Sequence, residues 1–198
     1  MGLDLDFTDG KTPLTDDEKE GLLIKSISTR GELDEFEQHH IEKAMLWLRR
    51  KQFSAEEIIS EKFVRDLHRR MYEGVWKRAG QFRRSEKNIG LASHQVSTSL
   101  RQLLGDCLFW FQHGTYPEEE LVIRFKHRLV QIHCFANGNG RHSRLLADVM
   151  MEKIFHRKAF TWGAANQAKQ GDPRTAYIKA LKEADNGDYD NLIDFAKS

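Results

Sequence analysis

Apolar residues recur along most of the chain at the three- and four-residue spacing of an amphipathic helix. This spacing predicts helices over about residues 32–51, 97–111 and 121–132, and a strongly apolar helix over about 145–155. Capping residues, or prolines that suit the first turn of a helix, predict further helix starts near Thr15, Ser54, Ser60 and Pro173. The pattern is that of an all-α protein.

The stretch from Phe82 to Val96 breaks the helical pattern. It contains Asn88-Ile89-Gly90-Leu91 without helical spacing, which predicts a loop with a short hairpin. Residues 1–30 are predicted to form an N-terminal lead-in and helix, and residues 31–198 one folded domain. A chain of 198 residues is long enough for one domain with a substantial core.

Composition narrows the class of protein without naming a function. The chain carries 31 Lys and Arg against 30 Asp and Glu, so its net charge does not indicate a nucleic-acid partner. The basic run from Arg65 to Arg84 also contains Asp66 and Glu73 at helical spacing, which favours a solvated helix face. Two cysteines, no secretory signal and no apolar run long enough to span a bilayer lead us to expect a cytoplasmic protein.

The candidate chemistry lies in one stretch, His133 to Arg144, between two of the predicted helices. Its glycines allow a close approach of the backbone to a phosphate, and the unpaired N–H groups of the next helical turn would point at that anion. Arg141 and Arg144 lie three residues apart, so both guanidinium groups project from neighbouring positions. The imidazole of His133 is the side chain here that suits a base near neutral pH. Together these groups predict phosphate-ester chemistry.

The same stretch resembles the signature of the Fic family, His-x-Phe-x-(Asp/Glu)-Gly-Asn-Gly-Arg-x-x-Arg. The matching residues are His133, Phe135, Gly138, Asn139, Gly140, Arg141 and Arg144. The chain also resembles the Fic subgroup called "mobile mystery protein B", which carries Asn at the acidic position, here Asn137. The resemblance implies a Fic-type helical bundle with a small β-hairpin flap. It also implies the transfer of AMP from ATP to a Ser, Thr or Tyr hydroxyl of a target protein, with Mg²⁺.

The resemblance assigns roles to individual residues. His133 would take the proton from the target hydroxyl, and Arg144 would reach the terminal phosphate. The remaining phosphate-binding residues would be Gly138, Asn139, Gly140 and Arg141. Asn137 would replace the acid that ligates Mg²⁺, and its uncharged amide would hold the metal more weakly than a carboxylate. This departure leaves the reaction open between AMP transfer and other Fic chemistry, such as phosphotransfer or the removal of AMP.

Two further elements of the family have counterparts in this chain. Arg83, Arg84 and the segment Asn88, Ile89, Gly90 and Leu91 occupy the place of the flap, where a target chain docks as an added strand. Ser28 and Glu32 match the first half of the inhibitory pattern Ser/Thr-x-x-x-Glu-Gly/Asn, whose glutamate pairs with the second signature arginine. The alternative interpretation is that Ser28 or Thr29 caps a helix and that Glu32 is an acid in its first turn.

The resemblance leaves a function outside enzyme catalysis open as well. The protein could be a nucleotide-binding partner in a mobile-element pair that resembles a toxin and its antitoxin, with little turnover. The subgroup implies a small helix-turn-helix partner protein. A homo-oligomer also remains open, whereas neither a membrane nor a nucleic-acid partner is expected.

Overall fold

The computed structural model describes residue 19 and residues 21–87, 89–163 and 173–198. Among these residues the regular structure is helical, which confirms the predicted all-α class. The α-helices are α2 (Arg30–Arg49), α3 (Ala55–Ile58), α4 (Glu61–Tyr72), α5 (Val96–His113), α6 (Glu118–Ile132), α7 (Asn139–Val149), α8 (Pro173–Asp185) and α9 (Asp190–Lys197). A short 3₁₀ helix, Ser93–Gln95, precedes α5, and a π-helical turn, Met150–Ile154, continues α7.

The helix starts follow from local hydrogen bonds that the sequence provides. Thr29 and Glu32 form a reciprocal capping box at the start of α2. Ser54 and Glu57 form a second capping box at α3, which is only four residues long, and Ser60 caps α4. The predicted helix near Thr15 lies almost entirely outside the described residues.

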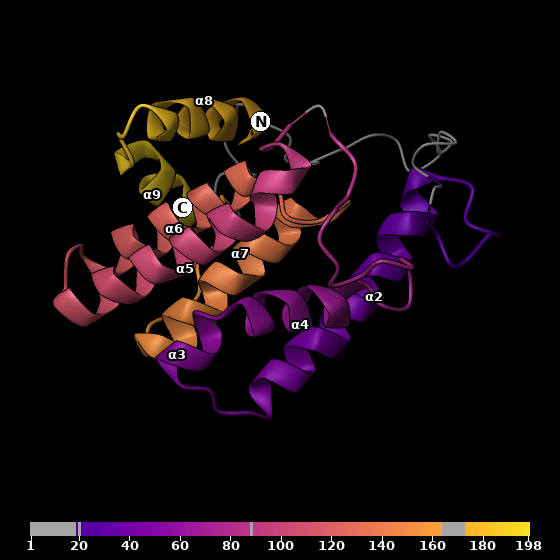
Figure 1. The fold of residues 1–198 in the computed structure, drawn as a ribbon, viewed down its shortest axis with the longest axis horizontal. Coiled ribbons are helices and arrows are strands. Elements are labelled where there is room, and N and C mark those ends of the chain that lie inside the picture. The colour runs from indigo at the N-terminus through magenta and orange to yellow at the C-terminus, as the bar shows by residue number, and fades with distance from the viewer. Residues whose placement is uncertain (1–18, 20, 88, 164–172) are drawn as a thin grey trace.

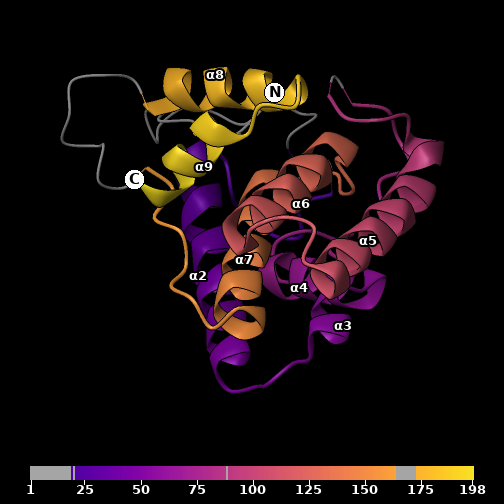
Figure 2. The same cartoon turned by 90° about the vertical axis from the view of Figure 1, so that its left-hand side faces the viewer.

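Helices α6 and α7 lie at the centre of the molecule (Figure 1). Helix α5 packs against α6, and α4 contacts both α2 and α7. Figure 2 shows α8 and α9 together at one end of the bundle and α3 at the opposite end. Because α6 and α7 are consecutive and packed on each other, their adjoining ends lie close together, and Cys134 and Phe135 of the short connection are buried.

The apolar interior has two parts. The larger cluster joins α2, α4, α5, α6 and α7, and includes the fully buried side chains of Tyr72 and Phe135. A smaller cluster packs α8 and α9 on α6 around Ile123. His127 of α6 reinforces that second contact: its Nε2 lies 2.9 Å from Oδ1 of Asp185, and its Nδ1 lies 3.3 Å from the hydroxyl of Tyr189.

The predicted hairpin between residues 82 and 96 is absent from the described part of that segment. Among the described residues the only β-type pairing is an isolated bridge between Leu22 and Trp76. The segment instead makes bends that are closed by side chains, and the Glu86 carboxylate accepts hydrogen bonds from the backbone N–H of Ser93 at 2.9 Å and from its hydroxyl at 2.6 Å. Side-chain hydrogen bonds here replace the cross-strand backbone pairs that a hairpin needs. In the described residues, no helix is both long enough and apolar enough to cross a membrane.

Candidate active site at the α6–α7 turn

Two residues in left-handed backbone conformations define the turn between α6 and α7. His133 ends α6 with φ 55°, and Gly138 precedes α7 with φ 73°. Positive φ is uncommon for a residue with a side chain and is often found at functional sites. At Gly138 a side chain is excluded, because a Cβ there would lie 2.4 Å from the ring of Tyr72.

The turn is held in one shape by hydrogen bonds to buried groups. The side-chain amide of Asn139 accepts from the backbone N–H of Phe135 at 2.9 Å and donates to the Phe135 carbonyl at 2.8 Å. The carbonyl of Asn137 lies 3.0 Å from Nε2 of His68, whose ring stacks on Phe135 with centroids 3.7 Å apart. The side chain of Asn139 therefore fixes the turn, and only its backbone remains to contact a phosphate.

The first turn of α7 presents backbone donors toward the site. The N–H of His142 makes the first helical hydrogen bond, 2.9 Å to the carbonyl of Gly138. The N–H groups of Asn139, Gly140 and Arg141 precede that bond, so the helix itself does not use them. Unused donors at a helix N-terminus favour the binding of an anion.

His133 is held as a neutral imidazole beside this turn. Burial, followed by the positive charges of Arg83 and Lys87, lowers the pKa of His133 to about 4. Its Nδ1 is buried and has no hydrogen-bond partner among the described residues. A buried polar atom without a partner is uncommon in folded proteins, and this one lies at the predicted catalytic position. A neutral ring near pH 7 is the form that can accept a proton.

Arg141 is tied to helix α2 by two carboxylates. Its Nη2 donates to Oε2 of Glu37, and its Nη1 lies 3.6 Å from Oδ1 of Asp34. Glu37 is only 2% exposed and also accepts from Nε1 of Trp76 at 2.6 Å. Burial raises the pKa of Glu37 against the opposing pull of Arg141. The charge of Arg141 is thus largely balanced within the protein.

Arg144, one turn further along α7, is in the opposite situation. It forms no hydrogen bond or ion pair with any residue that the structure describes. Burial lowers the pKa of its guanidinium. The neighbouring carboxylate of Asp148 accepts instead from Nε1 of Trp162 at 3.0 Å and from the N–H of Phe160 at 3.2 Å. Arg144 is therefore the signature guanidinium whose charge is available to a ligand.

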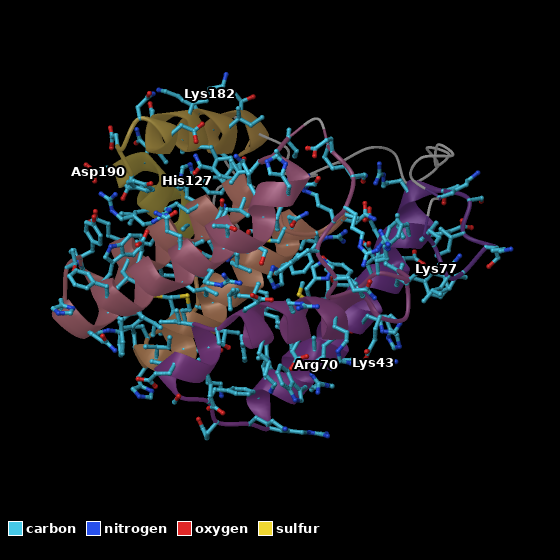
Figure 3. All side chains as sticks on the ribbon, viewed as in Figure 1. Lys43, Arg70, Lys77, His127, Lys182 and Asp190 are labelled. Carbon is cyan, nitrogen blue, oxygen red and sulfur yellow. The ribbon has the colours of Figure 1, made fainter. Side chains whose placement is uncertain are left out.

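A cavity of about 350 Å³ adjoins the turn on the side of Ala136 and Asn137. Three cations line it, Lys77, Arg78 and Lys87, and within the described residues none of them forms an ion pair. Figure 3 shows Lys77 beside α2, on the side of the molecule away from Asp190 of α9. The charges around this cavity favour an anionic ligand. In the described parts of the chain, no group of three or more His, Cys, Asp or Glu side chains is placed to hold a metal ion.

The predicted inhibitory pairing of Glu32 with Arg144 does not occur in this structure. The carboxylate of Glu32 accepts from the N–H of Ser28 at 2.8 Å and from that of Thr29 at 3.1 Å. These bonds hold Glu32 at the N-terminus of α2, as the alternative interpretation expected. The acid of α2 that does reach a signature arginine is Glu37, and its partner is Arg141.

The predicted flap residues meet the site at Gly90. A Cβ on Gly90 would lie 2.5 Å from the Cβ of His133, so the backbone of this segment packs directly on the histidine. Ile89 is partly buried and Leu91 is exposed, whereas Asn88 lies outside the described residues.

Sequence reasoning missed Glu37, Tyr72 and His68 as parts of the site. Each reaches the turn from α2 or α4, more than sixty positions earlier in the chain. Tyr72, for example, donates from its hydroxyl to the carbonyl of Gly138 at 3.3 Å. On their own helices these residues resemble ordinary core or surface positions, so no local signal identifies them.

Residues 58–151 match the family model described as the Fic/DOC family. The chain carries a Fic/DOC domain. The N-terminal FIC domain of Bep8 from Bartonella sp. 1-1C has a similar fold, with a TM-score of 0.67 and 15% identity over 87% of this chain and 88% of that one. BepC from Bartonella tribocorum, solved with bound AMPPNP, gives a TM-score of 0.63 and 16% identity over 92% and 97% of the two chains.

Fic-1 from C. elegans has a similar fold as well, with a TM-score of 0.66 and 22% identity over 90% of this chain. The match covers 51% of the Fic-1 chain, so this chain spans about half of its length. No curated protein sequence matches the chain. At these identities the solved structures show the fold alone.

Proposed function

We propose that this protein is a protein adenylyltransferase, which transfers AMP from ATP to a hydroxyl group of a target protein. The observation that carries the proposal is Arg144, a partly buried guanidinium without a described anionic partner, one turn into a helix that does not use its own first N–H groups. Such a site binds a phosphate, and the neutral His133 stands beside it as the base. The presence of a Fic/DOC domain supports this assignment.

The transfer step follows from this arrangement. The target hydroxyl gives its proton to His133 while its oxygen attacks the α-phosphorus of ATP. A new oxygen–phosphorus bond forms, the bond to the oxygen that bridges the α- and β-phosphates breaks, and pyrophosphate leaves. The N–H groups of Asn139, Gly140 and Arg141 stabilise the charge on the phosphate oxygens, and Arg144 holds the terminal phosphate.

The donor set for Mg²⁺ at this site is small. Of the described residues, the signature turn offers the metal the amide oxygen of Asn137 and no carboxylate. That set fits a Mg²⁺ ion bound mainly by phosphate oxygens and water, which is a common arrangement for this ion with a nucleotide. When bound, the ion would neutralise charge on the phosphates.

The same position motivates a second candidate function. Because Asn137 replaces the acid of the signature, another Fic reaction, phosphotransfer or the removal of AMP, stays open beside AMP transfer. The cations of the cavity, Lys77, Arg78 and Lys87, favour an anionic substrate in either reaction.

Mass spectrometry of the purified protein after incubation with ATP and Mg²⁺ tests the proposal. We expect an added AMP in the wild-type protein, and in the His133→Ala variant no added AMP with unchanged ATP binding. An added phosphate would instead favour phosphotransfer. Saturable ATP binding with no covalent product, also in the presence of candidate target proteins, would favour the nucleotide-binding partner.

The protonation of His133 gives a further test of the same mechanism. Because its pKa is lowered to about 4, the base is neutral above that value, and transfer should persist down to about pH 5 and fall below it. A loss of activity centred near the ordinary histidine pKa of about 6.5 would contradict this environment for His133.

A further inference from the structure

The guanidinium of Arg83 is buried between three separate backbone segments. Its Nε donates to the carbonyl of His133 at 2.6 Å, its Nη1 donates to that of Ser85 at 3.1 Å, and its Nη2 donates to that of Leu91. The backbone N–H of Arg83 also donates to the carbonyl of Cys134 at 3.0 Å. One side chain therefore binds the end of α6 and both ends of the loop from Ser85 to Leu91.

The described residues of the loop are held against the histidine and against each other. Gly90 packs against the Cβ of His133, and its own Cβ, if present, would lie 3.2 Å from Nη2 of Arg83. Outside this contact, the hydrogen bonds between Glu86 and Ser93 close the base of the loop. The carboxylate of Glu86 lies 3.8 Å from Nη1 of Arg83 and is largely exposed. The buried guanidinium is thus held chiefly by carbonyl groups.

The bond from Arg83 acts on the backbone conformation of His133 itself. A left-handed conformation at a histidine is sparsely populated and persists only where the surroundings enforce it. The Nε donor fixes the direction of the His133 carbonyl, and with it the peptide group that follows the Cα of His133. The imidazole is attached to that Cα through Cβ, so its direction depends on the same backbone conformation. The position of the ring and the position of the loop consequently depend on the same guanidinium.

We propose that Arg83 is a positioning residue that couples the flap to the catalytic histidine, so that a chain docked on Ile89–Leu91 is placed in register with the base. This inference rests on the proposed function, in which His133 is the base, and on the resemblance, which implies that the flap receives the target. Arg83 itself touches neither substrate in this mechanism. It acts by holding His133 and the flap in one geometry.

Three variants of the full chain test the coupling: Arg83→Met, Arg83→Lys and, as a control, Arg101→Met, which makes the same change at an exposed arginine of α5. For Arg83→Met we expect the transfer rate to fall by about 100-fold at an unchanged KM for ATP, because a small misplacement of a catalytic group has that order of effect. We also expect faster cleavage by trypsin after Lys87, in the loop that Arg83 holds. Arg83→Lys keeps the positive charge but has a single nitrogen, which cannot reach all three carbonyls as the forked guanidinium does. It should therefore be intermediate in both measurements, whereas the control should match the wild type.

The two readouts separate this inference from the proposed function. If the wild-type protein transfers nothing, the proposed function fails, and cleavage after Lys87 still decides whether Arg83 holds the loop. Wild-type transfer and wild-type resistance to trypsin in Arg83→Met would overturn the coupling. An equal loss of ATP binding and of transfer would overturn it too, since that result marks a general structural role. If the circular dichroism of Arg83→Met shows that this variant has lost its helices, the same two measurements on Arg83→Lys decide the question.

Discussion

Arg141 and Arg144 lie on one helix, one turn apart, and have the same side chain, yet their surroundings are opposite. Arg141 faces α2, where Glu37 and Asp34 balance its charge. Arg144 has no ion pair among the described residues, although burial disfavours its charged form. Removal of an arginine from a buried carboxylate leaves that carboxylate charged and without a partner, whereas an arginine without partners gains most from a bound anion. These surroundings indicate a structural role for Arg141 and favour the proposed role of Arg144 in binding the ligand.

The largest expected effect is on stability, in Arg141→Met. This change would leave the carboxylate of Glu37 buried without its partner, and breaking such a pair costs about 3 kcal/mol of unfolding free energy or more. Denaturant unfolding measures this loss. The double variant Glu37→Gln/Arg141→Met should recover most of the stability, because it removes the uncompensated charge and keeps an acceptor for Trp76. Equal stability of Arg141→Met and the wild type would contradict the assignment.

Arg144→Gln should show the reverse pattern. Loss of a charge-assisted contact to phosphate should weaken ATP binding by about 10- to 100-fold, which corresponds to roughly 1.5–3 kcal/mol. The unfolding free energy should stay unchanged or rise, because a buried and uncompensated charge is removed. Calorimetric titration with ATP and denaturant unfolding give the two values. Unaltered ATP affinity would mean that another group holds the terminal phosphate.

Asn137→Asp adds a negative charge at the turn, close to the proposed phosphate site. A carboxylate should hold Mg²⁺ better than an amide, so the Mg²⁺ concentration for half-maximal transfer should fall. Nucleotide binding without metal should change little, because Arg144 provides that contact. Parallel Mg²⁺ titrations of the two proteins measure the shift. An unchanged metal dependence would show that this side chain does not face the ion, and abolished transfer would favour another Fic reaction.

The smallest effect is expected for Glu32→Gly. Because Glu32 is bonded to Ser28 and Thr29, its removal should lower the melting temperature slightly and leave transfer unchanged. Glu32→Gln is the matched control, since a glutamine can still complete the capping box. Increased self-modification in Glu32→Gly but not in Glu32→Gln would support an inhibitory role for Glu32 after all.

Most of the helical framework could be predicted from the sequence. The capping box at Thr29, the α6–α7 turn and the lengths of α5 and α6 depend on hydrogen bonds or apolar spacing within about one element. The hairpin predicted near Gly90 was wrong for the described residues. Side chains of Arg83 and Glu86 hold this segment instead, and a local pattern of turn residues does not reveal their hydrogen bonds.

That a histidine, a glycine turn and two arginines meet at the start of one helix follows from the sequence alone, because these residues are neighbours along the chain. The packing of distant helices selects the arginine that has no ion pair among the described residues. Glu37 reaches Arg141 across 104 positions of sequence, and Glu32, five residues earlier on the same helix, does not. The choice follows from the position of Glu37, which is buried on α2 beside Arg141, since a buried carboxylate that stays charged needs a cation or hydrogen-bond donors around it.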